Sequence, residues 1–221
     1  MKEKSGAEIL VDSLIAQGVE VVFGYPGGAV LPIYDSLFEH KKLRHVLVRH
    51  EAGAAHAAEG YARATGKPGV VLVTSGPGAT NASIGVHTAM QDSTPMILFI
   101  GDVARDDRDR EGFQEVDFTA FFGPIAKWAA RIDSADRIPE YVARAYATAI
   151  SGRPGPVVLA LPEDMLGRQT DAIPRARVER PAQAPCPDAM QAMMALIGDA
   201  AAPLAIIGGG GWNARARAHF Q

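Results

Sequence analysis

Short apolar runs alternate with longer amphipathic segments along most of this chain, and each kind of segment predicts a different element. Residues 69–74 (GVVLVT) and 96–100 (MILFI) are continuously apolar, which is typical of strands buried on both faces of a parallel sheet. Other strands are predicted near residues 19–23, 45–49, 126–132 and 156–161. Helices are predicted near residues 6–17, 31–40, 52–65, 79–91 and 136–151, with a shorter helical turn around residues 114–122.

This alternation predicts an α/β fold built around one sheet. Strands separated by helices at this spacing favour parallel pairing, because each helix carries the chain back to the start of the next strand. We therefore expect a doubly wound, mostly parallel six-stranded sheet with helices on both faces. The first helix has its own start signal, since Ser5 and Glu8 have the spacing of a capping box.

The composition changes after residue 166. Residues 167–188 are rich in Pro, Arg, Gln and Ala without apolar periodicity, which indicates a linker. Beyond it, residues 189–197 predict a helix and residues 203–207 a strand that ends in four glycines. Such a tail cannot bury its own apolar face. We therefore expect a domain over residues 1–166 and an incomplete start of a second α/β domain over residues 189–221.

Composition and charge narrow the class of protein. Hydrophobic residues make up 48% and charged residues 21% of the 221 residues, a soluble globular balance. The net charge of −3, without a long basic run, argues against nucleic acid or a membrane as a partner. No apolar run reaches the length of a spanning helix or of a signal peptide, and the single cysteine, Cys186, excludes an internal disulfide. We expect a cytoplasmic protein.

The candidate chemistry is concentrated in residues 49–81, RHEAGAAHAAEGYARATGKPGVVLVTSGPGATN. Glu51 follows a short apolar strand and begins a helix made mostly of Ala and Gly. Residues this small let another backbone approach closely, so Glu51 would lie beside a crowded surface. A carboxylate there is either an anion stabilised by the helix terminus or a tuned acid or base, and composition alone leaves both open.

A glycine turn and a histidine pair lie in the same stretch. Gly76, Pro77 and Gly78 lie between a strand and a helix, where they form either a structural turn or a contact to a phosphate. They match neither a P-loop nor a dinucleotide fingerprint, whose third glycine position is Asn81 here. His50 and His56 are six residues apart, whereas the zinc-protease motif needs four, so we expect no metal site.

Together these motifs resemble the N-terminal, pyrimidine-binding domain of thiamine-diphosphate enzymes, most closely that of acetolactate synthase large subunits. The resemblance covers residues 6–166 and rests on FGYPGGAVLPIYD, VRHEAGAAHAAEGYARATGKPG, TSGPGATN, FQEVD and SGRPGPV. It implies that Glu51 hydrogen-bonds N1′ of the aminopyrimidine and favours the imino tautomer, whose nitrogen removes the thiazolium C2 proton. The implied walls around the pyrimidine are Tyr25, Pro26, Gly27, Gly28, Gly76, Pro77, Gly78 and Asn81.

The resemblance also implies a reaction and a second ligand. A 2-oxo acid such as pyruvate would be decarboxylated and its two-carbon unit transferred to a second carbonyl, as in branched-chain amino-acid biosynthesis. Phe113 and Gln114 would line the substrate channel. Arg153 matches an arginine that contacts FAD in synthases of this family, and residues 208–210 match the start of the FAD-binding central domain.

The sequence departs from the family pattern in two places. Acetolactate synthases usually have a lysine facing the substrate channel where this chain has Glu163, and an anion there would repel anionic pyruvate. Another thiamine-diphosphate-dependent decarboxylase or aldehyde lyase therefore stays open. The Gly-Asp-Gly segment that holds the diphosphate and Mg²⁺ in the family is not found, so we expect that site on a missing domain and predict that the isolated chain is inactive.

The small residues of one helix and the missing diphosphate site both predict a protein partner. The Ala/Gly face of residues 52–65 predicts a homodimer or higher oligomer, or pairing with a chain that carries the diphosphate-binding domain. A non-catalytic pyrimidine-domain module that pairs with a partner chain is the rival interpretation. A flavodoxin-like nucleotide-binding module is a third, supported by the glycine turns alone.

Overall fold

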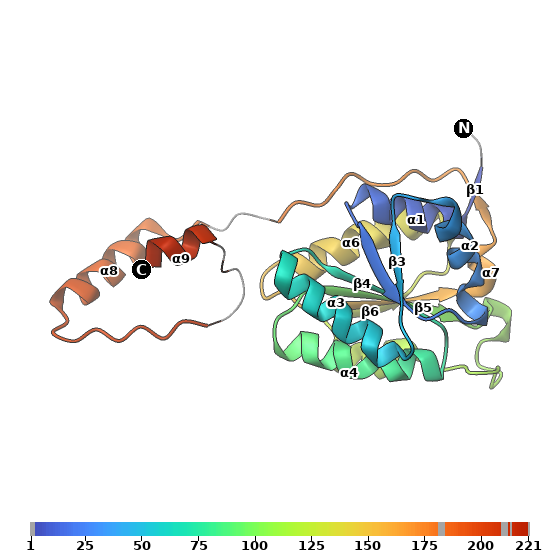
Figure 1. Ribbon diagram of the computed structural model, residues 1–221, viewed down its shortest axis with the longest axis horizontal. Helices are drawn as coiled ribbons and strands as arrows, with labels where there is room; N and C mark the ends of the chain where they lie inside the picture. Colours follow the sequence, from blue (N-terminus) through green and yellow to red (C-terminus); the bar gives the residue numbers. More distant parts are fainter. Residues whose placement is uncertain (1–2, 181–183, 209–211, 213, 221) are drawn as a thin grey trace. The chain divides into compact units, whose positions relative to one another are not determined.

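A parallel sheet forms the centre of the first of two units, Met1–Glu179 and Arg180–Gln221, into which the chain divides. The computed structural model describes residues 3–180, 184–208, 212 and 214–220 (Figure 1). Within these residues six strands pair side by side in the order β3-β2-β4-β5-β7-β6. The strands are β2 (Val21–Gly24), β3 (Arg44–Leu47), β4 (Gly69–Val73), β5 (Met96–Asp102), β6 (Trp128–Arg131) and β7 (Pro156–Pro162). Every neighbouring pair is parallel, which confirms the predicted doubly wound sheet.

Helices cover both faces of this sheet, as Figure 1 shows. On one face lie α1 (Gly6–Ala16), α2 (Leu31–Glu39) and α6 (Ile138–Ile150). On the other lie α3 (Glu51–Thr65), α4 (Pro77–Gln91) and the short α5 (Phe118–Phe122). The helix α7 (Glu163–Leu166) directly follows β7, and 3₁₀ turns occupy Gly28–Val30, Arg105–Asp107, Gly123–Ile125 and Ala135–Arg137. The predicted capping box of α1 is present, with both Ser5 and Glu8 bonded as expected.

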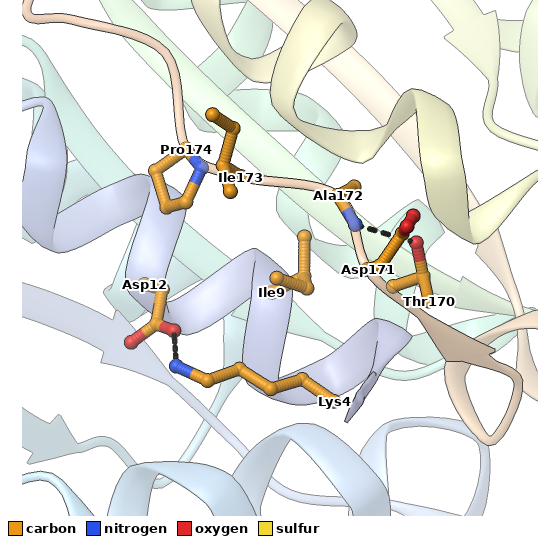
Figure 2. Close-up of a pocket in the computed structure, with 8 residues that line it drawn as sticks. All are labelled: Lys4, Ile9, Asp12, Thr170, Asp171, Ala172, Ile173 and Pro174. Atoms are coloured by element: carbon orange, nitrogen blue, oxygen red, sulfur yellow. Dashed lines mark hydrogen bonds and ion pairs between the residues drawn. The ribbon is translucent and has the colours of Figure 1, made fainter. Parts of the chain in front are cut away.

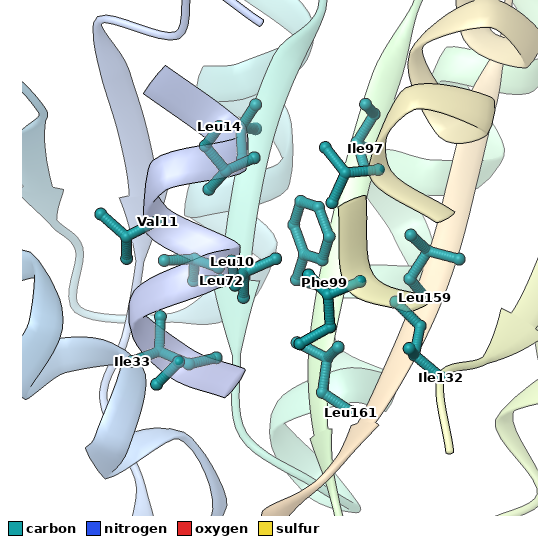
Figure 3. Packing of buried hydrophobic residues seen from close by; sticks show 14 of the residues in the cluster. Leu10, Val11, Leu14, Ile33, Leu72, Ile97, Phe99, Ile132, Leu159 and Leu161 are labelled. Atoms are coloured by element: carbon teal, nitrogen blue, oxygen red, sulfur yellow. The ribbon is translucent and has the colours of Figure 1, made fainter. Parts of the chain in front are cut away.

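The apolar core divides into one cluster on each side of the sheet. Leu10 and Leu14 of α1 pack towards Ile97 and Phe99 of β5, and all four side chains are almost completely buried (Figure 3). Burial of each such side chain contributes about 1.5–3 kcal/mol to folding. The central strands β4, β5 and β7 are buried along their whole length, and for β4 and β5 the continuous apolar runs predicted this.

On the other face, small residues bring α3 and α4 into close backbone contact. A Cβ atom added at Gly85 of α4 would collide with the side chain of Ala55 of α3, and one added at Gly69 of β4 would collide with the backbone of Ala58. The small residues on the inner side of α3 therefore let this helix pack tightly against α4 and the sheet.

Two predicted elements differ from the structure, and one short strand pair was not predicted. Residues 203–207, predicted as a strand, form none in the described part of the second unit, because a strand needs a neighbour for its backbone hydrogen bonds. The helical turn predicted from residue 114 begins only at Phe118. The unpredicted pair joins β1 (Lys4–Ser5) to β8 (Gln169–Thr170).

Part of the segment predicted as a linker belongs to the first unit and is hydrogen-bonded to the end of α1. The buried Gln17 side chain donates through Nε2 to the carbonyl oxygens of Arg175 (3.3 Å) and Ala176 (3.0 Å), and its Oε1 accepts from Val178 N (2.9 Å). In the second unit the predicted helix is confirmed as α8 (Pro187–Asp199), and α9 (Ala214–Phe220) follows. None of the helices in the described ranges is long and apolar enough to cross a membrane.

Replacing Gly85 by alanine should destabilise the first unit by about 1–3 kcal/mol, because the added methyl group overlaps Ala55 where α3 and α4 touch. Denaturant unfolding followed by circular dichroism measures the change. Gly60→Ala is the matched control: Gly60 also lies within a helix, but a Cβ there meets no atom within 4 Å, so alanine should stabilise by about 0.5–1 kcal/mol. Equal effects of the two substitutions would contradict the close packing of α3 and α4.

Candidate active site at the carboxyl edge of the sheet

The carboxyl ends of the parallel strands meet at one edge of the sheet, and most of the predicted site residues follow a strand there. The turn at residues 25–28 follows β2, and Glu51 begins the helix after β3. Residues 76–81 follow β4, and Glu163 follows β7. Phe113 and Gln114 belong to the long segment after β5. Open α/β sheets bind their ligands at this edge, so the fold brings the predicted residues to a suitable place.

Glu51 lies at the centre of this edge and is almost fully buried, with 8% of its surface exposed. It is the first residue of α3, after the extended N-cap His50, whose Nδ1 accepts a hydrogen bond from Ala52 N at 3.2 Å. Asn81 of α4 donates through Nδ2 to Glu51 Oε2 at 2.9 Å. No residue in the described part of the chain donates to Oε1. The carboxylate is stabilised by the helix N-terminus and keeps one oxygen for a ligand.

Two glycines from different turns pack against the same threonine beside Glu51. A Cβ at Gly78 would lie 2.8 Å from Thr74 Cγ2 and 3.3 Å from Glu51 Oε1, and a Cβ at Gly27 would lie 2.5 Å from Thr74 Cβ. The absence of side chains at Gly27 and Gly78 therefore lets the turn after β2 and the turn after β4 pack tightly on Thr74, beside Glu51. Thr74 was not predicted as a site residue, although a polar residue that ends an apolar strand is a signal for one.

Gln114 joins this cluster through Gly76. A Cβ at Gly76 would lie 2.7 Å from Gln114 Cβ, and the Gly76 backbone has a φ of +48°. Ser75 Oγ lies 3.5 Å from Gln114 Oε1. Gln114 itself has a φ of +63°, a conformation that costs a non-glycine residue on the order of 1 kcal/mol and that is concentrated at functional sites. The neighbouring Phe113 is 87% exposed.

The other predicted residues lie outside this cluster. Tyr25, Pro26, Gly28 and Pro77 are exposed at the rim, and Glu163 is exposed at the start of α7. Arg153 lies at the far end of α4, where Nε donates to Ser93 Oγ (2.8 Å) and Nη2 donates to the carbonyl oxygens of Met90 and Gln91 (both 2.9 Å). The length of α4 separates it from Gly78 by roughly 20 Å. The structure therefore does not bring Arg153 together with Glu51.

A pocket of about 290 Å³ lies on the α1 side of the sheet, away from Glu51 (Figure 2). It is lined by Lys4, Ile9, Asp12, Thr170, Asp171, Ala172, Ile173 and Pro174. Lys4 pairs with Asp12 across it, and Ala172 N donates to Thr170 Oγ1 at 3.1 Å. None of the predicted site residues contributes to this pocket. In the described ranges, moreover, no group of three or more His, Cys, Asp or Glu side chains could hold a metal ion.

Comparisons with known proteins identify relatives of the chain. Residues 4–121 match the family described as thiamine pyrophosphate enzyme, N-terminal TPP binding domain. The chain is 43% identical over 229 residues to an acetolactate synthase of Arthrospira platensis, covering 100% of the chain and 40% of the relative. It is 52% identical over 166 residues to the acetolactate synthase isozyme 3 large subunit of Escherichia coli, covering 75% of the chain and 29% of the relative. It is 45% identical over 214 residues to an acetolactate synthase of Mycobacterium bovis, covering 95% of the chain and 35% of the relative. The chain thus spans 29–40% of the length of these relatives.

Replacing Gly76 by alanine should destabilise the first unit by at least about 2 kcal/mol, since the methyl group collides with Gln114 in addition to straining a positive φ. Gly66→Ala separates the two causes. Gly66 has a φ of +73° but a Cβ there meets nothing within 4 Å, so only a backbone cost of about 1–2 kcal/mol is expected. Chemical denaturation measures both. A Gly76→Ala protein no less stable than Gly66→Ala would contradict the packing of Gln114 on this turn.

Proposed function

Since this chain belongs to the family of the thiamine pyrophosphate enzyme N-terminal domain, we propose that the carboxyl edge of its sheet binds the aminopyrimidine of thiamine diphosphate. The reaction we propose is the acetolactate synthase type of carboligation, in which a 2-oxo acid such as pyruvate is decarboxylated and its two-carbon unit joins a second carbonyl. The observation that carries the proposal is the buried Glu51 with one oxygen bonded to Asn81 and the other beside Gly78.

The residues at this edge fit a flat, nitrogen-bearing ring. Gly78 places no side chain over Glu51 Oε1, since a Cβ there would lie only 3.3 Å from that oxygen. Glu51 offers Oε1 to a ring nitrogen, where it can give or take a proton at N1′. Asn81 holds the other oxygen and so orients the carboxylate. When bound, thiamine diphosphate supplies the stabilisation of a carbanion that amino-acid side chains lack.

We propose no site for the diphosphate or its Mg²⁺ on the described part of this chain. No cluster of three or more His, Cys, Asp or Glu side chains is present there, and we derive no metal chemistry from it. We propose that this half of the cofactor is held by a partner chain or by a further segment, and that this chain alone does not turn over. Such a division would leave Glu51 and the pyrimidine walls as this chain's contribution to a shared site.

The outer surfaces of α3 and α4 support pairing with a second chain. Ile84 of α4 is 55% exposed, and Gly53 and Gly60 of α3 are exposed with no atom within 4 Å of a Cβ added at either. A partner backbone can approach closely where the side chains are this small. We propose that this surface joins the chain to a second copy, or to a chain carrying the diphosphate-binding domain. We place the enzyme in the cytoplasm because of its balance of apolar and charged residues.

FAD is the second ligand that we propose, at Arg153. The capping bonds of Arg153 use Nε and Nη2, so Nη1 is left for an anionic group of the flavin nucleotide. Of the glycines that match an FAD-binding domain, Gly208 is exposed, whereas residues 209 and 210 lie outside the described residues.

A different substrate is the alternative within the same family, and Glu163 favours it. Its side chain is exposed at the start of α7 without a partner in the described ranges, whereas the adjacent Asp164 is paired with Arg105. An unpaired carboxylate at the rim lowers the affinity for an anionic 2-oxo acid relative to a neutral aldehyde. This observation supports another thiamine-diphosphate-dependent decarboxylase or an aldehyde lyase.

Calorimetric titration of thiamine diphosphate with Mg²⁺ tests the proposed function. We expect binding in the presence of a diphosphate-binding chain and none by this chain alone. Glu51→Gln keeps the shape of the side chain and its bond to Asn81 but removes proton exchange, so thiamine-dependent turnover of pyruvate should fall by about 10²–10⁴-fold. Glu59→Gln, on the same helix, is the control and should retain turnover.

Two results would count against this proposal in different ways. Tight binding by the chain alone would mean that it holds the diphosphate itself. Partner-dependent binding without turnover of pyruvate or of an aldehyde would instead favour a non-catalytic module.

Reversing the charge at Glu163 distinguishes the two candidate substrate classes. Glu163→Lys should lower KM for pyruvate by about fivefold, because the change replaces a repulsion of roughly 0.5 kcal/mol at the rim by an attraction of similar size. Glu163→Gln should give about half of this effect in free energy, and both should weaken with added salt. Steady-state kinetics over a range of ionic strength measure the change. A KM for pyruvate that is unaffected by either substitution would place Glu163 outside the substrate channel.

A further inference from the structure

The mixed-charge run at residues 105–111 is bonded to residues that follow two other strands, β6 and β7. Arg105 contacts Asp164, the second residue of α7, through Nε (2.8 Å) and Nη2 (2.7 Å) to Oδ2, and its backbone N donates to Oδ1 at 2.9 Å. Its Nη1 also donates to the carbonyl oxygen of Asp133 at 2.8 Å. Three of these four bonds join the Arg105 guanidinium to an oxygen of Asp164 or Asp133. Residues outside the loop therefore hold this part of it in place.

Two further arginine–aspartate pairs lie beside the first. Arg108 Nη2 contacts Asp133 Oδ1 at 2.6 Å, and Arg131 Nε contacts Asp102 Oδ2 at 2.6 Å. Asp102 is fully buried, and burial raises the pKa of its carboxyl group while Arg131 opposes that rise. We call the six residues of these pairs the arginine–aspartate clasp: Asp102, Arg105, Arg108, Arg131, Asp133 and Asp164.

The innermost pair crosses a whole strand. Arg131 ends β6 and Asp102 ends β5, but β7 lies between them, with Ala160 in register with Arg131. Side chains alternate along a strand, so Arg131 points to the same face as Ala129, which packs in the core on the α3 and α4 side. Ala160 belongs to that cluster too, and its small side chain leaves room for Arg131 to pass over β7. The clasp therefore binds β5, β6 and β7 together on the face of the candidate site.

The clasp holds the segment that carries Phe113 and Gln114, two of the predicted substrate contacts. Glu115 closes the segment on itself, because its carboxylate accepts from Asp109 N (2.7 Å) and Gly112 N (2.9 Å). Gln114 is thereby held against Gly76, close to the Glu51 cluster. At the other end of the clasp, Asp164 directly follows Glu163. The ion pairs of Arg105 and Arg108 thus hold the start of the segment that leads to Gln114, and the pair of Arg105 with Asp164 holds the backbone beside Glu163.

We propose that the arginine–aspartate clasp is a positioning element that sets the separation between Gln114 and Glu163 and thereby the fit of the 2-oxo acid. This inference rests on the proposed function, which supplies the substrate. Its members act through Gln114 and Glu163 and need no contact with substrate themselves. Charge-assisted, forked contacts such as that of Arg105 with Asp164 suit this role, because they restrict orientation as well as distance.

Arg105→Gln in the full chain tests the clasp, because it removes the side-chain contacts to Asp164 and Asp133. Both partners are partly exposed, so water can replace the lost contacts and the protein should still fold. Amides of residues 103–117 should exchange with deuterium about tenfold faster, as measured by mass spectrometry. Arg105→Lys keeps the charge without the fork and should give an intermediate rate. The matched control is Arg137→Gln, which breaks a forked contact to Glu140 (2.7 and 3.1 Å) at the start of α6 and should leave the segment unchanged.

A kinetic readout separates positioning from stability. In the assembly that shows thiamine-dependent turnover, Arg105→Gln should raise KM for pyruvate about tenfold and leave kcat within about twofold, because Glu51 and its partners are untouched. Unchanged exchange in residues 103–117 would overturn the clasp, and faster exchange with an unchanged KM would overturn its role in positioning. Absence of thiamine-dependent turnover in the unmodified protein would instead contradict the proposed function, and exchange would then decide on the clasp alone.

Discussion

The parallel direction of the strands is the constraint on which the rest of this structure depends. Every strand of the six-stranded sheet ends at the same edge, and the helices between these strands return along its faces so that the next strand can begin. Turns that are more than a hundred residues apart in sequence, such as those at residues 25–28 and at Glu163, are therefore collected at one edge of the sheet. The candidate site is a consequence of this geometry, and its chemistry depends on which side chains the turns carry.

Close backbone packing is the second requirement of the site. Asn81 reaches Glu51 only because α3 and α4 touch along residues without bulk, such as Ala55 and Gly85. Larger residues would push the helices apart and break the hydrogen bond between their first turns. Small residues thus serve two purposes on these helices. On the inner side they set the geometry of the carboxylate, and on the outer side they leave a surface that a second chain can approach.

Much of the fold, but less of the site, could be predicted from the sequence. The continuous apolar runs of β4 and β5 identified buried parallel strands correctly, because burial of both faces leaves a local signal. The convergence of Gly27, Gly78 and Glu51 followed from resemblance to a family and not from spacing. The arginine–aspartate clasp was missed, since a pair such as Arg131 and Asp102 depends on strand order. The helix predicted from residue 114 starts later because Gln114 has a positive φ and Asp117 caps Phe118–Phe122.

The bond from Asn81 also decides where a proton can reside on Glu51. An amide nitrogen can only donate, so Glu51 Oε2 must act as the acceptor in that hydrogen bond whatever the charge of the carboxyl group. A proton carried by Glu51 is therefore favoured on Oε1, the oxygen next to Gly78, because the unprotonated oxygen is the stronger acceptor for Asn81. The two oxygens of one side chain are in this way made chemically distinct. A neutral amide, which does not titrate, gives the carboxyl group a preferred direction for proton exchange.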